Sequence, residues 1–225
     1  MKKIIHSILL SGSLLTAVAY ADNASPLQQD ILNDQTQWAH INYELPDNQK
    51  EAAFSALATH EAALIQTYPN RAEPLIWHAI ILSSLAGTEG GLGALGKVKE
   101  ARNQLLAAEK IDPTAMNGSI EASLGTLYYK VPGWPLSFGD DGKAEAYLKK
   151  ALQINPNGID PNYFYADFLY GKHNYGAAMQ ALQKALAAPP RPDRPLADQG
   201  RRKEVLALME KIRTNHPDAI ASLGH

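Results

Sequence analysis

The sequence of 225 residues contains no cysteine, and only 8% of its residues are aromatic. Without cysteine the chain has no disulfide bond, thiolate zinc site, iron–sulfur cluster or thiol nucleophile. It also lacks an excess of one charge, since 21 Lys and Arg face 23 Asp and Glu. This near balance excludes the broad basic surface that nucleic-acid binding needs. Redox proteins, disulfide scaffolds and nucleic-acid-binding proteins are therefore disfavoured from the start.

The first 21 residues have the pattern of a bacterial signal peptide. Lys2 and Lys3 precede a mostly apolar stretch, Ile4–Leu15, and a small-x-small site follows at Ala19–Ala21. The stretch is shorter than the roughly 18–20 residues of a membrane-spanning helix, and no cysteine follows it to carry a lipid anchor. We therefore predict that residues 1–21 are removed by cleavage after Ala21, that the protein is exported to the periplasm, and that the mature chain has no membrane span. Removing these residues leaves 19 Lys and Arg against 23 Asp and Glu, a net charge of −4.

Alanine and leucine are abundant instead, with 34 and 28 copies, more than a quarter of the chain. Both residues favour helices, and no segment shows the alternation of apolar and polar residues that is typical of a β-strand. The composition therefore predicts an all-α fold.

One spacing rule occurs three times: Ala, three residues, Leu, two residues, Ala, four residues, Pro. Small alanines let neighbouring helices approach, leucine fills the space between them, and proline ends the helix. The three copies are Ala101, Leu105, Ala108 and Pro113; Ala144, Leu148, Ala151 and Pro156; and Ala178, Leu182, Ala185 and Pro190.

This rule resembles the second helix of the tetratricopeptide repeat, a pair of antiparallel helices of 34 residues. The first helices of the units match the family less evenly. They carry Leu124-Gly125 with Tyr128, Tyr165-Ala166 with Leu169, and Trp77 with Ile80 and Ile81. A divergent first unit lies around Asn48–Pro69. The resemblance implies a right-handed α-solenoid of antiparallel helix pairs with inserted loops and a C-terminal capping helix.

The resulting organisation has four parts. A signal peptide (1–21) and an N-terminal segment (22–47) precede a repeat domain of about four helix pairs (48–190). A proline-rich bend and a capping helix, Leu196 to about Asn215, occupy 191–225, and the charges of that helix are expected to face solvent. Two units exceed 34 residues because of insertions between their helices, which are expected at 87–96 and 131–142.

No motif in the chain predicts catalysis, a cofactor or a metal. Gly91–Gly96 spells GxGxxG, but a helix is expected before it where nucleotide-binding motifs need a strand. Position 98 is Val, where a P-loop has Ser or Thr. This segment is therefore interpreted as a flexible or tightly turned insertion, and the histidines as surface or partly buried side chains. Asp140 or Asp141 is expected to cap the helix that follows.

Aromatic residues are concentrated, since eleven of the 17 lie between positions 128 and 175. Packing of the core explains Tyr128 and Tyr165. The first helices of tetratricopeptide repeats line a concave groove, and the resemblance places further aromatic and charged residues there. The loop containing Trp134 and Phe138 is expected to fold over this groove. The candidate binding residues are Tyr129, Lys130, Trp134, Phe138, Asp160, Tyr163, Phe164, Asp167 and Tyr170.

Three functions follow from these predictions. The first is a non-catalytic periplasmic scaffold or adaptor that binds a protein or peptide of the cell envelope in the concave groove. The alternative is a component that binds a small ligand and assists a TRAP-type or other envelope transporter. A closed cavity would favour the small ligand, and an open trough the peptide. An enzyme built on the repeats is the third and least supported.

Overall fold

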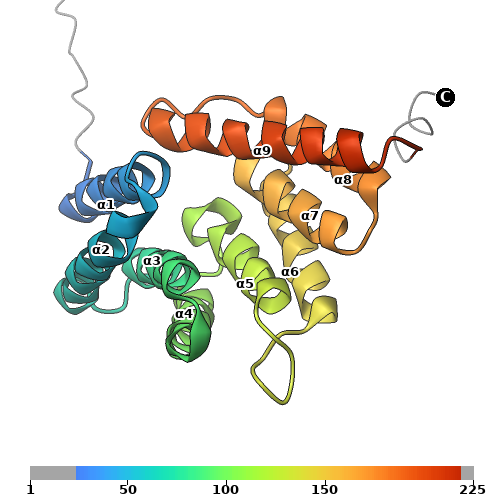
Figure 1. Cartoon of the computed structure of the whole chain (residues 1–225). Coiled ribbons are helices and arrows are strands. Elements are labelled where there is room, and N and C mark those ends of the chain that lie inside the picture. Colours follow the sequence, from blue (N-terminus) through green and yellow to red (C-terminus); the bar gives the residue numbers. More distant parts are fainter. Residues whose placement is uncertain (1–23, 219–225) are drawn as a thin grey trace, which may run out of the picture.

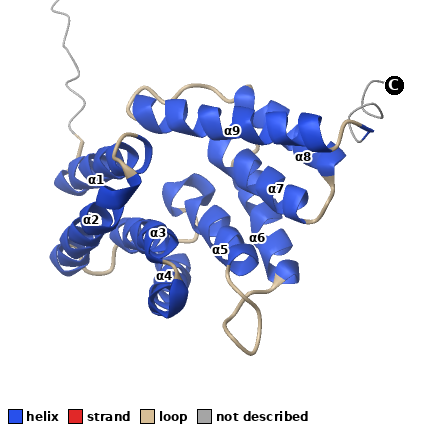
Figure 2. Cartoon of the chain, in the orientation of Figure 1, coloured by secondary structure: helices blue, strands red, loops and turns tan. Residues whose placement is uncertain are grey.

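The computed structural model describes residues 24–218, and within this range all regular structure is helical, with no β-strand (Figures 1 and 2). The predicted signal peptide lies outside the described residues. None of the helices between residues 24 and 218 has the length and hydrophobicity needed to cross a membrane. The elements are α1 (Pro26–Tyr43), α2 (Asp47–Thr67), α3 (Ala72–Glu89), α4 (Gly91–Ile111), the 3₁₀ helix η1 (Ala115–Gly118), α5 (Ser119–Lys130), α6 (Asp141–Ile154), α7 (Ile159–Gly171), α8 (Tyr175–Leu186) and α9 (Pro195–Asn215).

Helices pack in antiparallel pairs, of which α3–α4, α5–α6 and α7–α8 have the most extensive contacts. The repeated rule accounts for this packing, because all nine of its alanines and leucines are fully buried. Helices α4, α6 and α8 end before the corresponding prolines. The predicted all-α, tetratricopeptide-like solenoid is therefore confirmed.

The Leu-Gly pair of the third unit has a direct steric reason. A Cβ atom built on Gly125 in α5 would lie 2.6 Å from Cγ of Leu148 in α6. Only glycine lets the two helices of this unit approach so closely, with the leucine of the repeated rule filling the contact.

The prediction of an inserted loop at 87–96 is wrong, because these residues lengthen the two helices on either side. Helix α3 continues to Glu89, α4 begins at Gly91, and the reversal occurs at Gly90 and Gly91, whose φ angles are +65° and +66°. A helical glycine costs only about 1 kcal/mol relative to alanine, which the long α3–α4 contact offsets. An ion pair of 2.7 Å between Lys97 Nζ and Glu89 Oε2 also joins the extended ends.

The second insertion forms an ordered loop between α5 and α6. The Gly139 amide donates to the Pro132 carbonyl at 2.9 Å, and the Asp140 amide donates to the Tyr128 carbonyl at 2.8 Å. The Asp140 side chain then accepts from the Lys143 amide at 3.0 Å and caps α6, which confirms the predicted capping residue.

The N-terminal segment contains a helix that the sequence analysis did not assign. Helix α1 begins at a capping box, in which Ser25 and Gln28 satisfy each other's backbone amides, and Pro26 occupies the first turn. The pattern Ser-Pro-x-Gln is visible in the sequence and is the signal that was missed.

The last helix does more than cap the final unit. Helix α9 packs on α8, as expected, but it also contacts α7 and α1, so it crosses from the last repeat to the first (Figure 1). The expectation that its charges face solvent is wrong for Asp198 and Arg201, which are buried. Asp198 pairs with Arg191, and Arg201 pairs with Asp160, on the concave side of the solenoid. These ion pairs offset the cost of burying the charges.

Candidate functional site

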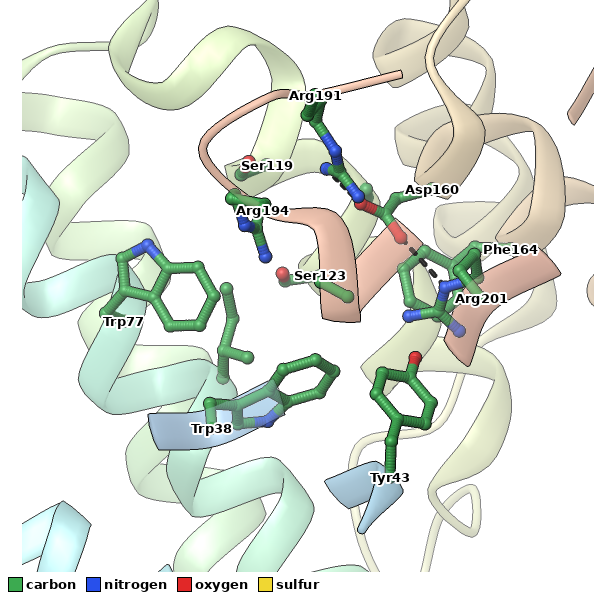
Figure 3. Close-up of a pocket in the computed structure, with 13 residues that line it drawn as sticks. Trp38, Tyr43, Trp77, Ser119, Ser123, Asp160, Phe164, Arg191, Arg194 and Arg201 are labelled. Carbon is green, nitrogen blue, oxygen red and sulfur yellow. Dashed lines mark hydrogen bonds and ion pairs between the residues drawn. The ribbon is translucent and has the colours of Figure 1, made fainter. Parts of the chain in front are cut away.

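A cavity of about 90 Å³ lies where α9 crosses the concave side of the solenoid (Figure 3). Its walls come from α1, α3, α5, α7 and α9, and from the segment that leads into α9. The lining residues are Trp38, Tyr43, Trp77, Ile80, Ser119, Ala122, Ser123, Asp160, Phe164, Arg191, Arg194, Ala197 and Arg201.

Two larger cavities adjoin it and share its walls. A cavity of about 440 Å³ shares Ser119, Asp160, Arg191 and Arg194 with the first. Another, of about 230 Å³, shares Trp38, Ile80, Ser123, Phe164 and Arg201. The shared walls show that the three spaces lie side by side, and together we call them the central passage.

The two ends of the central passage differ in chemistry. One end, here called the basic mouth, holds Arg191 and Arg194 beside the first residues of α5 and α7. The opposite end is lined by Asn42, Ser83 and Thr126, with Glu204. Between them the wall is largely aromatic and aliphatic. The basic mouth therefore has two arginines, whereas the opposite end has one, Arg201, which lies beside Glu204.

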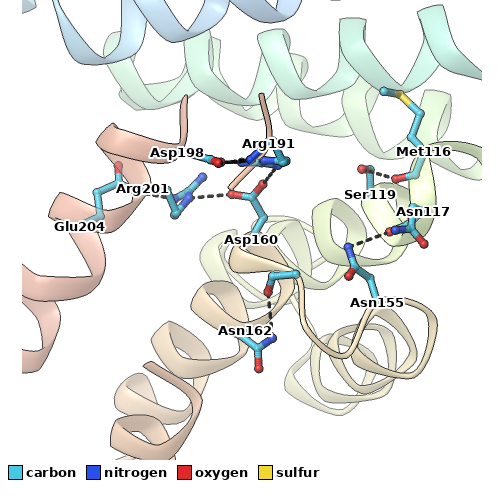
Figure 4. Close-up of polar contacts among 11 residues, drawn as sticks. Met116, Asn117, Ser119, Asn155, Asp160, Asn162, Arg191, Asp198, Arg201 and Glu204 are labelled. Carbon is cyan, nitrogen blue, oxygen red and sulfur yellow. Dashed lines mark hydrogen bonds and ion pairs between the residues drawn. The ribbon is translucent and has the colours of Figure 1, made fainter. Parts of the chain in front are cut away.

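The basic mouth is built on a folded turn before α7. The Asn162 side-chain amide is buried and donates to the carbonyls of Pro156 at 2.9 Å and Gly158 at 2.8 Å (Figure 4). These bonds hold the turn, so Asp160 on the first turn of α7 has a defined position.

Asp160 anchors the segment around α9 to α7. Its carboxylate lies 2.8 Å from Arg191 Nη1 and 2.8 Å from Arg201 Nε. Burial opposes ionisation of Asp160, but the Arg201 and Arg191 guanidinium groups outweigh burial and hold its pKa well below the ordinary value. Asp198 accepts from Arg191 and Glu204 from Arg201, so both arginines are neutralised by carboxylates (Figure 4).

Only two of the predicted binding residues line this site, namely Asp160 and Phe164. Tyr163 and Tyr170 lie on the same helix but pack beneath α9. The Arg201 guanidinium is 4.6 Å from the centre of the Tyr163 ring, and Lys211 Nζ is 4.8 Å from the centre of the Tyr170 ring. Burial, with the nearby Glu204 carboxylate, raises the pKa of Tyr163 to about 12.

Three further predicted residues contact one another rather than the central passage. The Tyr129 hydroxyl donates to Asp167, and Lys130 Nζ lies 2.6 Å from the same carboxylate. Burial raises the pKa of Tyr129, and the charge of Asp167 raises it further. This cluster joins α5 to α7, so its geometry indicates a contact between repeats.

The loop between α5 and α6 does not fold over the groove as expected. Phe138 packs on Tyr128, with ring centres 5.7 Å apart, and the Arg102 guanidinium lies 4.3 Å from its ring centre. Trp134 is 89% exposed and Leu136 is 68% exposed. The hydrogen bonds within the loop hold it beside α4 and α6, away from α9.

Several lining residues escaped the sequence analysis, above all Trp38, Arg191, Arg194 and Arg201. They lie outside the segments that match the repeat signature, and only the long-range closure by α9 brings them together. Trp77 was recognised as a signature residue but not as part of a site. The one available signal was the presence of three arginines around the proline-rich bend, within eleven residues of one another.

The described residues offer no evident place for a metal ion, because no three His, Asp or Glu side chains among them converge. The central passage instead presents aromatic surface, hydroxyl groups and guanidinium groups. These can bind an organic molecule through apolar contact and hydrogen bonds.

Comparison with known proteins shows which part of the chain matches a repeat family. Residues 136–195, which include α6, α7 and α8, match the tetratricopeptide repeat family. No curated protein matches the chain. The family match, the repeated Ala–Leu–Ala–Pro spacing and the antiparallel helix pairs together support a tetratricopeptide repeat architecture for the chain.

Proposed function

We propose that the chain is a non-catalytic binding protein that takes a small organic molecule into the central passage. The observation that carries this proposal is the position of α9, which contacts both α1 and α7 across the concave side. A peptide in the groove of a repeat protein needs an open trough, whereas α9 covers part of this groove and leaves partly covered spaces with mostly apolar walls, which suit small ligands better. Of the three functions considered from the sequence, the small-ligand-binding component is thus favoured over the scaffold.

The cellular setting of this function is part of the proposal. The Lys-Lys start, the short apolar stretch and the Ala-x-Ala site support export to the periplasm. We propose that the protein works there as a ligand-binding accessory to a TRAP-type or other envelope transporter. Such a role requires binding of the ligand and no catalysis.

A second candidate is a scaffold or adaptor for envelope proteins. Tetratricopeptide repeats suggest protein interaction in general, and the exposed Trp134 and Leu136 favour such a surface here. Large aromatic side chains often supply most of the energy of a protein interface. This surface lies on the loop between α5 and α6, so it can coexist with a ligand in the passage.

The test is to fill the passage. Ser123 is half-buried and lines two of the three cavities, so Ser123→Phe should block ligand entry while adding apolar contacts. Native mass spectrometry after incubation with an envelope extract should show small molecules retained by the wild type and lost in this variant. Ser55→Phe, on an exposed position of α2, is the matched control and should retain them.

Equal retention by both variants would exclude the passage as the binding site. Melting temperatures establish that each variant is folded, and Ser83→Phe at the opposite end is a second blocking variant. The scaffold function instead predicts that proteins captured from the extract are lost with Trp134→Ala and kept with Ser123→Phe.

A further inference from the structure

The arginines of the basic mouth are not equivalent. Arg191 and Arg201 each lie between two carboxylates. Arg194 makes no ion pair with any described residue, although it lies in the same segment. Its Nε atom is buried and no hydrogen-bond partner for it occurs in the part of the chain that the structure describes.

This leaves a cation without a direct carboxylate partner, although Asp160, Asp193 and Asp198 act on it from a greater distance. Burial lowers the pKa of Arg194, and the neighbouring Arg191 lowers it further, while nearby carboxylates offset only part of the effect. A guanidinium stays charged at any physiological pH. Because the Arg194 side chain is half-buried and its charge has no direct partner, an anion at this position would be stabilised.

Arg194 also faces the apolar part of the passage. Its Cζ atom is 5.2 Å from the centre of the Trp77 ring, and Figure 3 shows the guanidinium directed between Trp77 and Ser123. Trp77 Nε1 is a second buried donor without an acceptor among the described residues. Beyond these donors the wall consists of Trp38, Ile80 and Phe164.

The dimensions restrict the apolar part of the ligand. The cavity to which the two tryptophans and Phe164 contribute has a volume of about 90 Å³ in all. An apolar cavity of about 150 Å³ is enough to bind benzene, so this smaller space suits an unbranched chain better than a fused ring. The adjoining cavities give such a chain length in both directions.

We infer that the ligand of the central passage is an amphiphilic carboxylate, bound by Arg194 through its carboxylate and by Trp38, Trp77 and Phe164 through an unbranched chain. This inference rests on the proposed function, because it names the ligand class of the same passage. The carboxylate accepts hydrogen bonds from the guanidinium, and the chain replaces water along the apolar wall.

Isothermal titration calorimetry with three probes tests each part of this inference. Octanoate carries both the anion and the chain, 1-octanol carries the chain alone, and acetate carries the anion alone. Octanoate should bind at least about tenfold more tightly than either of the others, because only it uses both features.

Arg194→Gln should weaken octanoate binding about tenfold to a hundredfold, as expected for a lost charge-assisted hydrogen bond. It should change the affinity for 1-octanol by less than about twofold. Arg194→Lys keeps the charge and should retain much of the octanoate affinity. Arg213→Gln, at an exposed position near the end of α9, is the matched control and should behave as the wild type.

The outcomes separate the inference from the function on which it rests. If 1-octanol binds as tightly as octanoate, and Ser123→Phe abolishes both, the passage binds ligands but the role of Arg194 is wrong. If octanoate binding survives Ser123→Phe and Arg194→Gln alike, the passage is not the site, and both proposals fall. If no probe binds, the assignment of an amphiphilic carboxylate is overturned, and the envelope-extract experiment alone decides the function.

Discussion

At the scale of single residues, the fold buries two carboxyl groups side by side, which requires that one of them be protonated. Asp34 in α1 and Glu61 in α2 are both fully buried, and His60 Nε2 lies 3.4 Å from Asp34 Oδ1 at the edge of the pair. Burial raises the pKa of Glu61 to about 10, with contributions from Asp34 and Asp30. Glu61 is therefore protonated at neutral pH and can donate to Asp34.

This protonation predicts a loss of stability in alkaline solution. Glu61 has an ordinary pKa of 4.5 and a pKa of about 10 in the folded chain. Its contribution is therefore fully present below pH 4.5 and is lost as the pH rises towards 10. Glu61→Gln keeps a donor without a titration. At pH 9 the variant should exceed the wild type in free energy of unfolding by at least about 1 kcal/mol.

Urea unfolding at pH 5, 7 and 9 provides the measurement, and the difference between variant and wild type should grow with pH. Glu51→Gln, at an exposed position of the same helix, serves as the control and should show a difference that stays constant. A constant difference for Glu61→Gln as well would mean that Glu61 is ionised in the fold.

At the scale of the helix pair, the repeated spacing predicted contacts more reliably than it predicted helix ends. The positions of Ala144, Leu148 and Ala151 follow from local spacing, and all three are buried as expected. The reversal at Gly90 did not follow, because glycine is compatible with both loops and helices. Packing between α3 and α4 makes the glycine-rich segment helical, and the residues of that segment do not by themselves predict this contact.

Two glycines of similar local structure should respond oppositely to alanine. Gly125→Ala places a Cβ against Leu148 in α6, so it should lower the free energy of unfolding by about 1–3 kcal/mol. A Cβ atom added to Gly96 in α4 would meet no other atom within 4 Å. Gly96→Ala should therefore raise stability by about 0.5–1 kcal/mol. Denaturant unfolding of both variants gives the comparison, and a similar sign for both would refute the steric argument.

At the scale of the whole molecule, α9 turns an open array into a closed arc. The contact with α1 depends on Gly200, because a Cβ there would lie 2.4 Å from the ring of Tyr43. In an open solenoid each repeat is stabilised only by its neighbours. Here the first and last helices also stabilise each other.

Gly200→Ala tests this coupling. The substitution should cost about 1–3 kcal/mol and loosen α1 and α9 together, because each covers the other. Hydrogen exchange should increase in both helices and change little in α5 and α6. Faster exchange in α9 alone would show that the two helices are not coupled.

The arrangement of the whole molecule is also what the sequence did not predict. Counting along the repeat placed Asp160 and Phe164 on the concave side, because that position depends on one helix pair. It also placed Tyr129 and Asp167 near it, although these residues contact each other. Trp38 and Arg194 contribute to the site only because α9 returns to α1. No local pattern specifies such a return, so this half of the site required the structure.

The return of α9 also has a consequence for biogenesis. Synthesis delivers the chain from its N-terminus, so the early repeats can pair before α9 exists. The central passage needs residues from α1 and from the segment around α9, and closing so long a loop of chain is slow. The central passage is therefore completed in the last step of folding, and a chain cut short before residue 191 would lack it even with its repeats in place.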